Sequence, residues 1–193
     1  MQTIRYGLVG TGMMGVEHLH NLAITPGAVV TAIADPVPES IAWARGVLGD
    51  RAHDVAAFDT AAALAASGLV DAVVVASPNH THRDVLPPLF DAGLHILCEK
   101  PVATTIDDAR WIVARAAAAR GVFWTAMEYR YMPPAAAFIA DIHAGRVGRS
   151  ACARSTAPMA GMCGAGELRA MRSLMPRALS PDIGYRSHRS NNE

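Results

Sequence analysis

Three glycines near the amino terminus have a spacing that suits the binding of a phosphate group. They belong to the run Gly10, Thr11, Gly12, Met13, Met14 and Gly15. In this spacing the first glycine permits a tight turn out of a strand, and the second lets the backbone approach a pyrophosphate. The third lets the following helix lie close to a sheet. The pattern therefore predicts a dinucleotide site, with a purely structural glycine turn as the alternative.

Asp35 lies twenty residues after Gly15, at the end of a second apolar run over residues 28–34. A carboxylate at this distance accepts hydrogen bonds from the adenosine ribose hydroxyls of NAD and repels the 2′-phosphate of NADP. No arginine follows Asp35 directly. We therefore expect NAD in preference to NADP. The alternative is an ordinary turn residue before Pro36.

Lys100 is the one lysine of the chain. The other sixteen of its seventeen lysine and arginine residues are arginine. Lysine can exchange its proton in a protein, whereas arginine cannot. Beside an oxidised nicotinamide ring, the ring charge and desolvation would lower the pKa of Lys100. Lys100 could then accept or donate the proton of a substrate hydroxyl as general base or acid. The alternatives are a chance of composition and a surface ion pair with Glu99.

A further polar cluster, residues 77–82, follows the β-branched run 70–76. Ser77, Pro78 and Asn79 are expected to line the nicotinamide ribose, and His82 to be a hydrogen-bonding group at the site edge. The cluster could equally be a helix-starting turn, because serine and asparagine are good caps. His80 and His82 are two residues apart and do not share a helix face, so no metal site is expected.

The elements that must position these residues alternate along the chain. Strands are expected at 4–9, 28–34, 52–58, 70–76, 94–98 and 122–129, and helices at 16–24, 38–49, 59–68, 77–92, 105–120 and 132–143. Such alternation predicts an α/β fold of Rossmann type, a doubly wound parallel sheet with helices on both faces. Ligands bind outside the carboxyl ends of such strands, where all four polar clusters fall. The residues expected to contact the cofactor are Gly10, Thr11, Gly12, Met13, Met14, Gly15, Asp35, Ser77, Pro78, Asn79, His82, Glu99 and Lys100.

The bulk composition bounds the class of protein. A chain of 193 residues that is 51% hydrophobic and 18% charged is typical of a globular domain with room for the beginning of a second. The apolar runs are strand-sized, and the amino terminus has no signal-peptide pattern, so a cytoplasmic protein without a membrane span is expected. The three cysteines have no paired spacing. The sequence has no basic stripe with interleaved aromatic residues, so we do not expect a nucleic-acid partner.

With these residues placed, the chain resembles the Gfo/Idh/MocA family of oxidoreductases. The matching stretches are GLVGTGMMG, the IADP around Asp35, ASPNHTH at 76–82, AGLHILCEKP at 92–101, and YRYMP at 129–133 before GRVG at 145–148. The resemblance covers residues 3 to about 150 and implies an NAD(P)-binding Rossmann domain. It also implies that Lys100 contacts both the cofactor and a substrate, usually a sugar, inositol or related polyol.

The last 45 residues depart from that family, whose second domain is an open sheet with an Asp-x-x-x-His pair. Residues 149–193 contain no valine and one isoleucine, and the fourth residue after Asp182 is Arg186. Since strands favour β-branched residues, we interpret 1–148 as the NAD(P)-binding domain and 149–193 as a remnant in place of the substrate domain. A non-catalytic dinucleotide-binding protein and an inactive truncated fragment are the alternatives. A homo-oligomer remains open.

Overall fold

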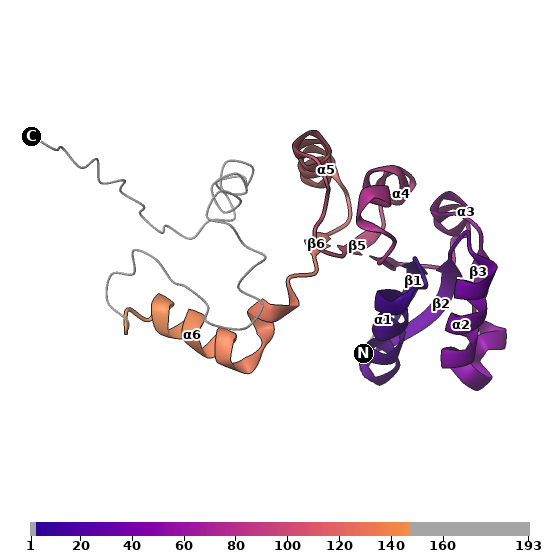
Figure 1. The fold of residues 1–193 in the computed structure, drawn as a ribbon, viewed down its shortest axis with the longest axis horizontal. Coiled ribbons are helices and arrows are strands. Elements are labelled where there is room, and N and C mark those ends of the chain that lie inside the picture. Colours follow the sequence, from indigo (N-terminus) through magenta and orange to yellow (C-terminus); the bar gives the residue numbers. More distant parts are fainter. Residues whose placement is uncertain (1–2, 147–193) are drawn as a thin grey trace, which may run out of the picture. The chain divides into compact units, whose positions relative to one another are not determined.

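A six-stranded sheet, parallel throughout, organises the part of the chain that the computed structural model describes, residues 3–146. The strands lie in the order β3-β2-β1-β4-β5-β6 (Figure 1). This is the strand order of the Rossmann fold. Successive strands are added on one side of β1 as far as β3 and then on its other side from β4 onward. The strands are β1 (Ile4–Val9), β2 (Ala28–Ala34), β3 (Ala56–Phe58), β4 (Ala72–Val75), β5 (His95–Cys98) and β6 (Phe123–Thr125).

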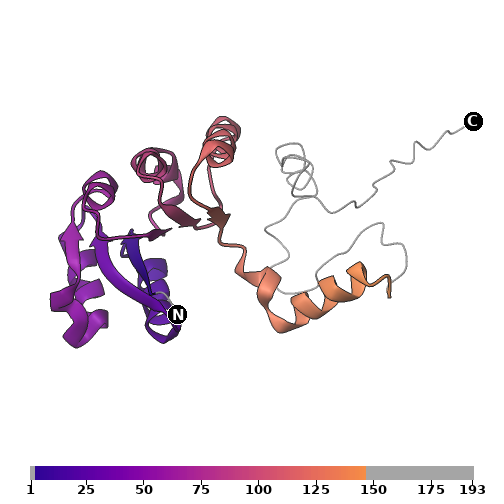
Figure 2. The ribbon, with the colours of Figure 1, turned by 180° about the vertical axis from the view of Figure 1, so that it is seen from behind.

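Helices cover both faces of this sheet. On one face lie α1 (Met13–Ile24) and α2 (Pro38–Leu48). On the other face lie α3 (Ala61–Ala66), α4 (His82–Asp91) and α5 (Ile106–Ala118), and the view from behind in Figure 2 shows the same two layers. The faces differ because right-handed crossovers run outward from β1 on one side and from β4 on the other. The expected fold class is confirmed.

Two hydrophobic cores follow from the alternation of side chains along the central strands. Leu8 of β1 and Val74 of β4 point to the face of α1 and α2. Their neighbours Val9, Val73 and Val75 point to the face of α3, α4 and α5. A strand such as β4, buried at every position, therefore needs apolar residues on both faces, which is why its sequence is a continuous apolar run.

Helix caps explain where several helices begin. The hydroxyl of Thr60 accepts a hydrogen bond from the N–H of Ala63 at the start of α3. Thr105 does the same for Asp108 at the start of α5. These contacts satisfy N–H groups that have no partner inside the helix.

Several expected boundaries were wrong, and three of them concern the site edge or its neighbours. The strand expected over 52–58 is reduced to β3, because a 3₁₀ helix, η1 (Gly49–Asp54), occupies its first half. The strand expected over 122–129 ends at Thr125, and a second 3₁₀ helix, η3 (Glu128–Tyr131), follows before α6 (Pro133–His143). Helix α1 begins three residues earlier than expected, within the glycine run itself.

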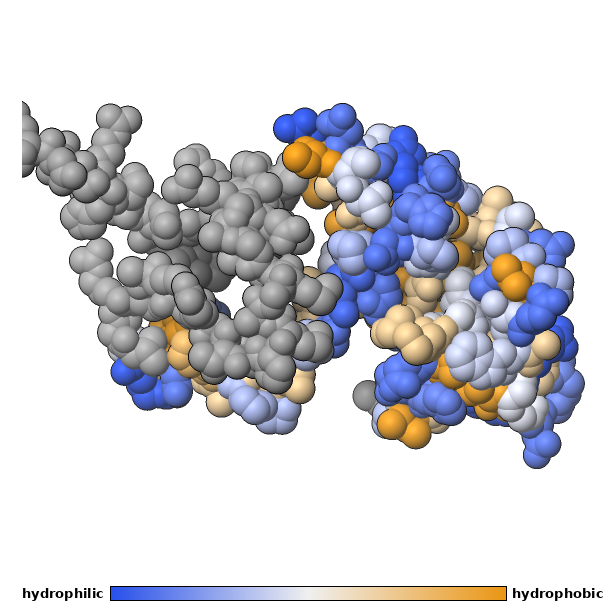
Figure 3. Space-filling view, in the orientation of Figure 1, coloured by the Kyte–Doolittle hydropathy of each residue, from blue (hydrophilic) through white to orange (hydrophobic). Residues whose placement is uncertain are grey.

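The surface of the described residues is of mixed polarity. On the face that Figure 3 shows, hydrophobic residues occur in small groups among hydrophilic ones. No described helix has the length and hydropathy that a membrane span requires. The predicted remnant at 149–193, with Asp182, lies outside the described residues, so the division of the chain at residue 148 stays a prediction.

Candidate functional site

The predicted site residues meet at one edge of the sheet because the strands end in register. Val9 pairs with Ala34 and with Val75, and Val75 in turn pairs with Cys98. Beyond each strand, the next residue donates its N–H to the last carbonyl of the neighbouring strand. These hydrogen bonds run from Gly10 to Ala34, from Ala76 to Val9, from Glu99 to Val75 and from Ala126 to Cys98, with N···O distances of 2.8 to 2.9 Å. Backbone hydrogen bonds thus join neighbouring strands as far as their carboxyl ends, from β2 to β6.

The three glycines of the loop have three different surroundings. Gly10 has a φ of +89°, and a Cβ there would lie 2.4 Å from the backbone nitrogen of Ser77. A Cβ on Gly15 would lie 2.2 Å from the carbonyl oxygen of Gly10. A Cβ on Gly12, in contrast, would have no atom within 4 Å. Gly10 and Gly15 are therefore required by packing within the protein, whereas nothing in the protein itself occupies the space beside Gly12.

The amino terminus of α1 is open to an anion. No side chain caps this helix at Gly12, and no acidic residue stands in its first turn. The first intrahelical hydrogen bond runs from Val16 N–H to the Gly12 carbonyl, so the N–H groups before Val16 have no partner inside the helix. Met13 and Met14, in this first turn, are exposed. Unpaired N–H groups and the helix dipole together suit a pyrophosphate. The open space beside Gly12, which we call the cradle, has room for it.

Asp35 fastens the glycine loop to the end of β2. Its Oδ2 accepts hydrogen bonds from the Thr11 N–H at 2.8 Å and from the Thr11 hydroxyl at 3.2 Å. Its Oδ1 accepts one from the N–H of Val37 at 2.9 Å, which is the turn expected as the alternative function of Asp35. A carboxylate has about four acceptor positions, so Asp35 keeps capacity for a ribose hydroxyl while it holds the loop.

The cluster after β4 forms a short 3₁₀ helix, η2 (Asn79–Thr81), that leads into α4. Pro78 and Asn79 are exposed, and Ser77 is half-buried with its hydroxyl accepting a hydrogen bond from Thr81 at 2.8 Å. His82 lies beneath the edge and not on it, since it is 0% exposed.

The His82 ring connects two loops of the edge. Its Nε2 lies 3.1 Å from the carbonyl oxygen of Ser77, and its Nδ1 lies 3.2 Å from that of Val102. The Cys98 thiol lies beside the same ring, and burial raises its pKa to about 12. In this structure His82 shapes the site through Ser77; a direct contact with a cofactor stays a prediction.

Glu99 is buried and connects α1 to Lys100. Its Oε1 lies 2.8 Å from Nε2 of His18 on α1, and its Oε2 accepts the backbone N–H of Lys100 at 3.1 Å. No local pattern predicts the contact of His18, because 81 residues separate it from Glu99. The ion pair between Glu99 and Lys100 side chains, considered as an alternative, does not form; both Glu99 oxygens have other partners.

The Lys100 side chain pairs instead with Glu128 of η3, with 3.1 Å between Nζ and Oε1. The hydrogen bond to Glu128 is the main reason that the pKa of Lys100 is raised above its usual value. The effect of an oxidised nicotinamide ring would have the opposite sign. Glu128 was missed in the sequence because the expected strand over 122–129 contained it.

A pocket of about 370 Å³ opens between α1, the end of β5 and η3. Its walls include Met14, His18, Glu99, Trp124, Glu128 and Tyr131. The pocket therefore adjoins both the open end of α1 and the partner of Lys100. No group of three or more histidine, cysteine, aspartate or glutamate side chains suited to a metal ion occurs among residues 3–146.

The sequence matches a known protein family over most of the described residues. The family described as an oxidoreductase family with an NAD-binding Rossmann fold matches residues 4–127. The chain belongs to the Gfo/Idh/MocA family. Among curated Gfo/Idh/MocA relatives, inositol 2-dehydrogenase 1 of Saccharopolyspora erythraea is 40% identical over 113 residues, which are 58% of this chain and 33% of that protein. Inositol 2-dehydrogenase of Streptomyces avermitilis is 35% identical over 151 residues, 77% of this chain and 43% of that protein.

Solved Gfo/Idh/MocA structures agree with the fold. An oxidoreductase from Agrobacterium radiobacter, in complex with NAD⁺, L-tartaric acid and magnesium, superimposes with a TM-score of 0.69 at 26% identity, over 77% of this chain and 42% of that one. The WlbA dehydrogenase from Bordetella pertussis, in complex with NADH and UDP-GlcNAcA, gives 0.68 at 28% identity, over 77% and 44%. The chain thus contains an NAD(P)-binding Rossmann domain, and its match spans about a third of the length of the first curated relatives.

Proposed function

We propose that this chain binds NAD along the carboxyl edge of its sheet and is the cofactor half of an oxidoreductase acting on a polyol or sugar carbon. The observation that carries the proposal is the combination of an uncapped α1 and an open cradle at Gly12. Unpaired donors at that position have no function in the fold itself, whereas an anionic pyrophosphate would satisfy them.

Each residue of the edge has a distinct task in this proposal. Gly12 and the first turn of α1 hold the pyrophosphate, and Asp35 receives a ribose hydroxyl. Lys100 moves the proton that leaves or joins the substrate oxygen, a step that typically contributes ~10²–10⁴-fold to a rate. When bound, the nicotinamide group supplies the hydride donor or acceptor.

Asp35 is the residue on which the choice of NAD depends. Its carboxylate already accepts hydrogen bonds from Thr11 and Val37, so it is fixed in place and negatively charged. A fixed carboxylate favours two ribose hydroxyls and disfavours a 2′-phosphate by like-charge repulsion. The inositol dehydrogenases among the relatives make an inositol or another polyol the first substrate class to try.

A calorimetric titration with NAD and with NADP tests the proposal. The unmodified chain should bind NAD more tightly than NADP. Asp35→Asn should weaken NAD binding by about tenfold, since a charged hydrogen bond is lost. It should also reduce the ratio by which the chain binds NAD more tightly than NADP. Asp50→Asn makes the same charge change on an exposed residue of η1, which follows the carboxyl end of α2, and should leave both affinities unchanged. Absence of binding to both cofactors, or tighter binding of NADP, would contradict the proposal.

A further inference from the structure

The side chain of Lys100 is held by one carboxylate. Lys100 and Glu128 follow adjacent strands, β5 and β6, whose last residues Cys98 and Thr125 are paired in register. The hydrogen bond from the Ala126 N–H to the Cys98 carbonyl extends this pairing by one residue. The short turn into η3 then brings Glu128 to 3.1 Å from the lysine Nζ. The contact therefore depends on backbone pairing and not on two freely moving surface chains.

Three titratable groups act on the lysine from the elements around it. Glu128 and Tyr129 belong to η3, and Glu99 belongs to the end of β5. The Tyr129 ring lies 5.9 Å from Nζ. Glu99 is occupied by His18 and by the backbone N–H of Lys100. Of the two carboxylates, Glu128 is thus the one that receives the ammonium group.

Position, and not burial, distinguishes this pair from an ordinary surface contact. The Lys100 side chain is 38% exposed and that of Glu128 is 51% exposed, so the Coulomb attraction itself stabilises the fold very little. However, Glu128 lines the pocket beside α1, with His18, Glu99 and Glu17 among its other walls. The carboxylate that pairs with the one lysine of the chain therefore also lines the pocket next to the first turn of α1.

We propose that Glu128 is a positioning residue for Lys100: its carboxylate, itself part of the pocket wall, holds the ammonium group beside that pocket for proton transfer to a substrate oxygen. This inference rests on the proposed function for its last step. In that step a bound reduced nicotinamide would supply the hydride to a carbonyl carbon, and Lys100 Nζ would give its proton to the carbonyl oxygen. The products are an alcohol, the oxidised cofactor and a neutral amine. Glu128 thus favours the reductive direction, because oxidation of an alcohol requires the neutral amine at the start.

Because Lys100 is the one lysine, its titration can be followed without assignment. Reductive methylation with ¹³C-formaldehyde labels its Nζ and the terminal amine, and the terminal amine titrates well below a lysine. The pKa of Lys100 is then read from the NMR signal as the pH is raised, in the intact chain without cofactor. We expect a lower pKa in Glu128→Gln than in the unmodified chain, with Glu128→Asp between the two because it restores the charge on a shorter arm.

Asp107→Asn is the matched control, since Asp107 is an exposed carboxylate that pairs with Arg110. It should leave the pKa of Lys100 unchanged. An equal pKa in Glu128→Gln and in the unmodified chain, or an equal fall in Asp107→Asn, would overturn the inference. Failure of the unmodified chain to bind NADH would remove the proposed function without altering this titration, so the two failures are distinguishable.

Discussion

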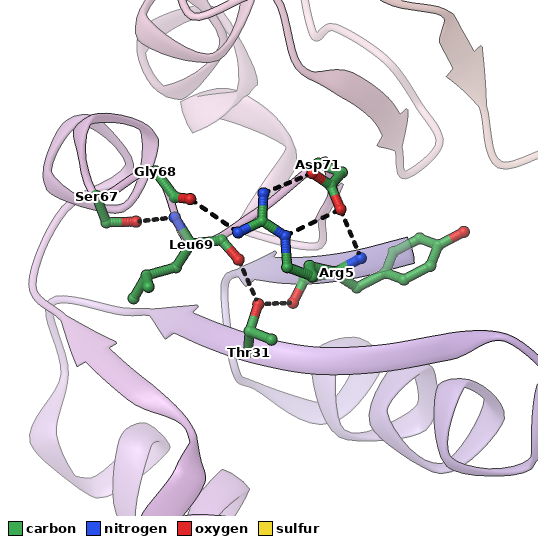
Figure 4. A network of polar contacts seen from close by, with 7 residues as sticks. Arg5, Thr31, Ser67, Gly68, Leu69 and Asp71 are labelled. Carbon is green, nitrogen blue, oxygen red and sulfur yellow. Dashed lines mark hydrogen bonds and ion pairs between the residues drawn. The ribbon is translucent and has the colours of Figure 1, made fainter. Parts of the chain in front are cut away.

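The two edges of the sheet use similar polar residues in opposite ways. At the amino edge, Arg5 and Asp71 form hydrogen bonds and an ion pair with each other (Figure 4). Asp71 accepts from the backbone N–H and from the guanidinium of Arg5, at 2.7 to 3.1 Å. Arg5 also donates to the Gly68 carbonyl at 3.0 Å, and the Thr31 hydroxyl donates to that of Leu69 at 2.8 Å. These groups satisfy one another and leave little capacity for a ligand.

At the carboxyl edge, donors and acceptors remain with capacity to spare. The first turn of α1 has no cap, Gly12 has open space beside it, and Asp35 has acceptor positions beyond those used by Thr11 and Val37. The difference teaches that the type of residue does not distinguish a site from a structural network. What distinguishes them is whether the fold itself has already used the hydrogen-bonding capacity.

The largest expected effect lies in the packing beneath the carboxyl edge. Gly15→Ala would place a methyl group 2.2 Å from the Gly10 carbonyl oxygen, so the helix or the loop must move. We expect the free energy of unfolding to fall by about 3 kcal/mol, as measured by urea denaturation. Gly46→Ala is the control, because Gly46 lies inside α2 with no atom within 4 Å of a Cβ. It should gain about 0.5–1 kcal/mol from helix propensity. Equal midpoints for the two variants would contradict this account of the loop.

A smaller effect is expected from the histidine beneath the same edge. His82→Ala leaves one carbonyl, that of Ser77 or that of Val102, without the N–H that the buried ring donates, and should cost about 2 kcal/mol in the free energy of unfolding. His80→Ala removes an exposed histidine two residues earlier and should change stability by less than about 0.5 kcal/mol. Thermal unfolding of the two variants side by side gives the comparison. If His80 proved the more important, the assignment of the buried contact would be wrong.

The smallest effect is expected at the amino edge. The Arg5 guanidinium lowers the pKa of Asp71 from 3.8 to about 2 by hydrogen bonding. Because the folded-state pKa is depressed, this stabilisation is present above pH ~4 and is lost as the pH falls towards 2. Asp71→Asn should therefore lower the Tm slightly at pH 7 and make it less dependent on pH between 4 and 2, whereas Asp59→Asn should not. Since the pair is exposed, the change should be modest; parallel acid profiles for both variants would exclude this function of Asp71.

The sequence predicted the order of elements and the edge at which the candidate site residues come together, because both depend on local patterns. Continuous apolar runs identify buried parallel strands, and the glycine spacing identifies the turn after β1. The short β3 and β6 were misjudged, since η1 and η3 contain no glycine or proline break at their borders with these strands that the sequence pattern could reveal.

The side-chain partners of the site could not be predicted. The contacts of Glu99 with His18 and of Lys100 with Glu128 join residues far apart in the chain, and such pairs depend on register and on the turns between strands. His82 was placed at the right edge but at the wrong depth, because one histidine in a polar cluster does not indicate which way its ring points. Contacts of the predicted residues with a cofactor stay predictions.

The most direct test of the open cradle is the binding of NADH to Gly12→Ala, followed by nicotinamide fluorescence. The new methyl group would meet no atom of the protein, so stability should fall by less than about 1 kcal/mol, the usual size of a change at a helix cap. If the pyrophosphate occupies that space, affinity should fall at least tenfold relative to the unmodified chain and to Gly46→Ala. A folded Gly12→Ala variant that binds NADH as tightly as the unmodified chain would contradict the account of this edge as the cofactor site.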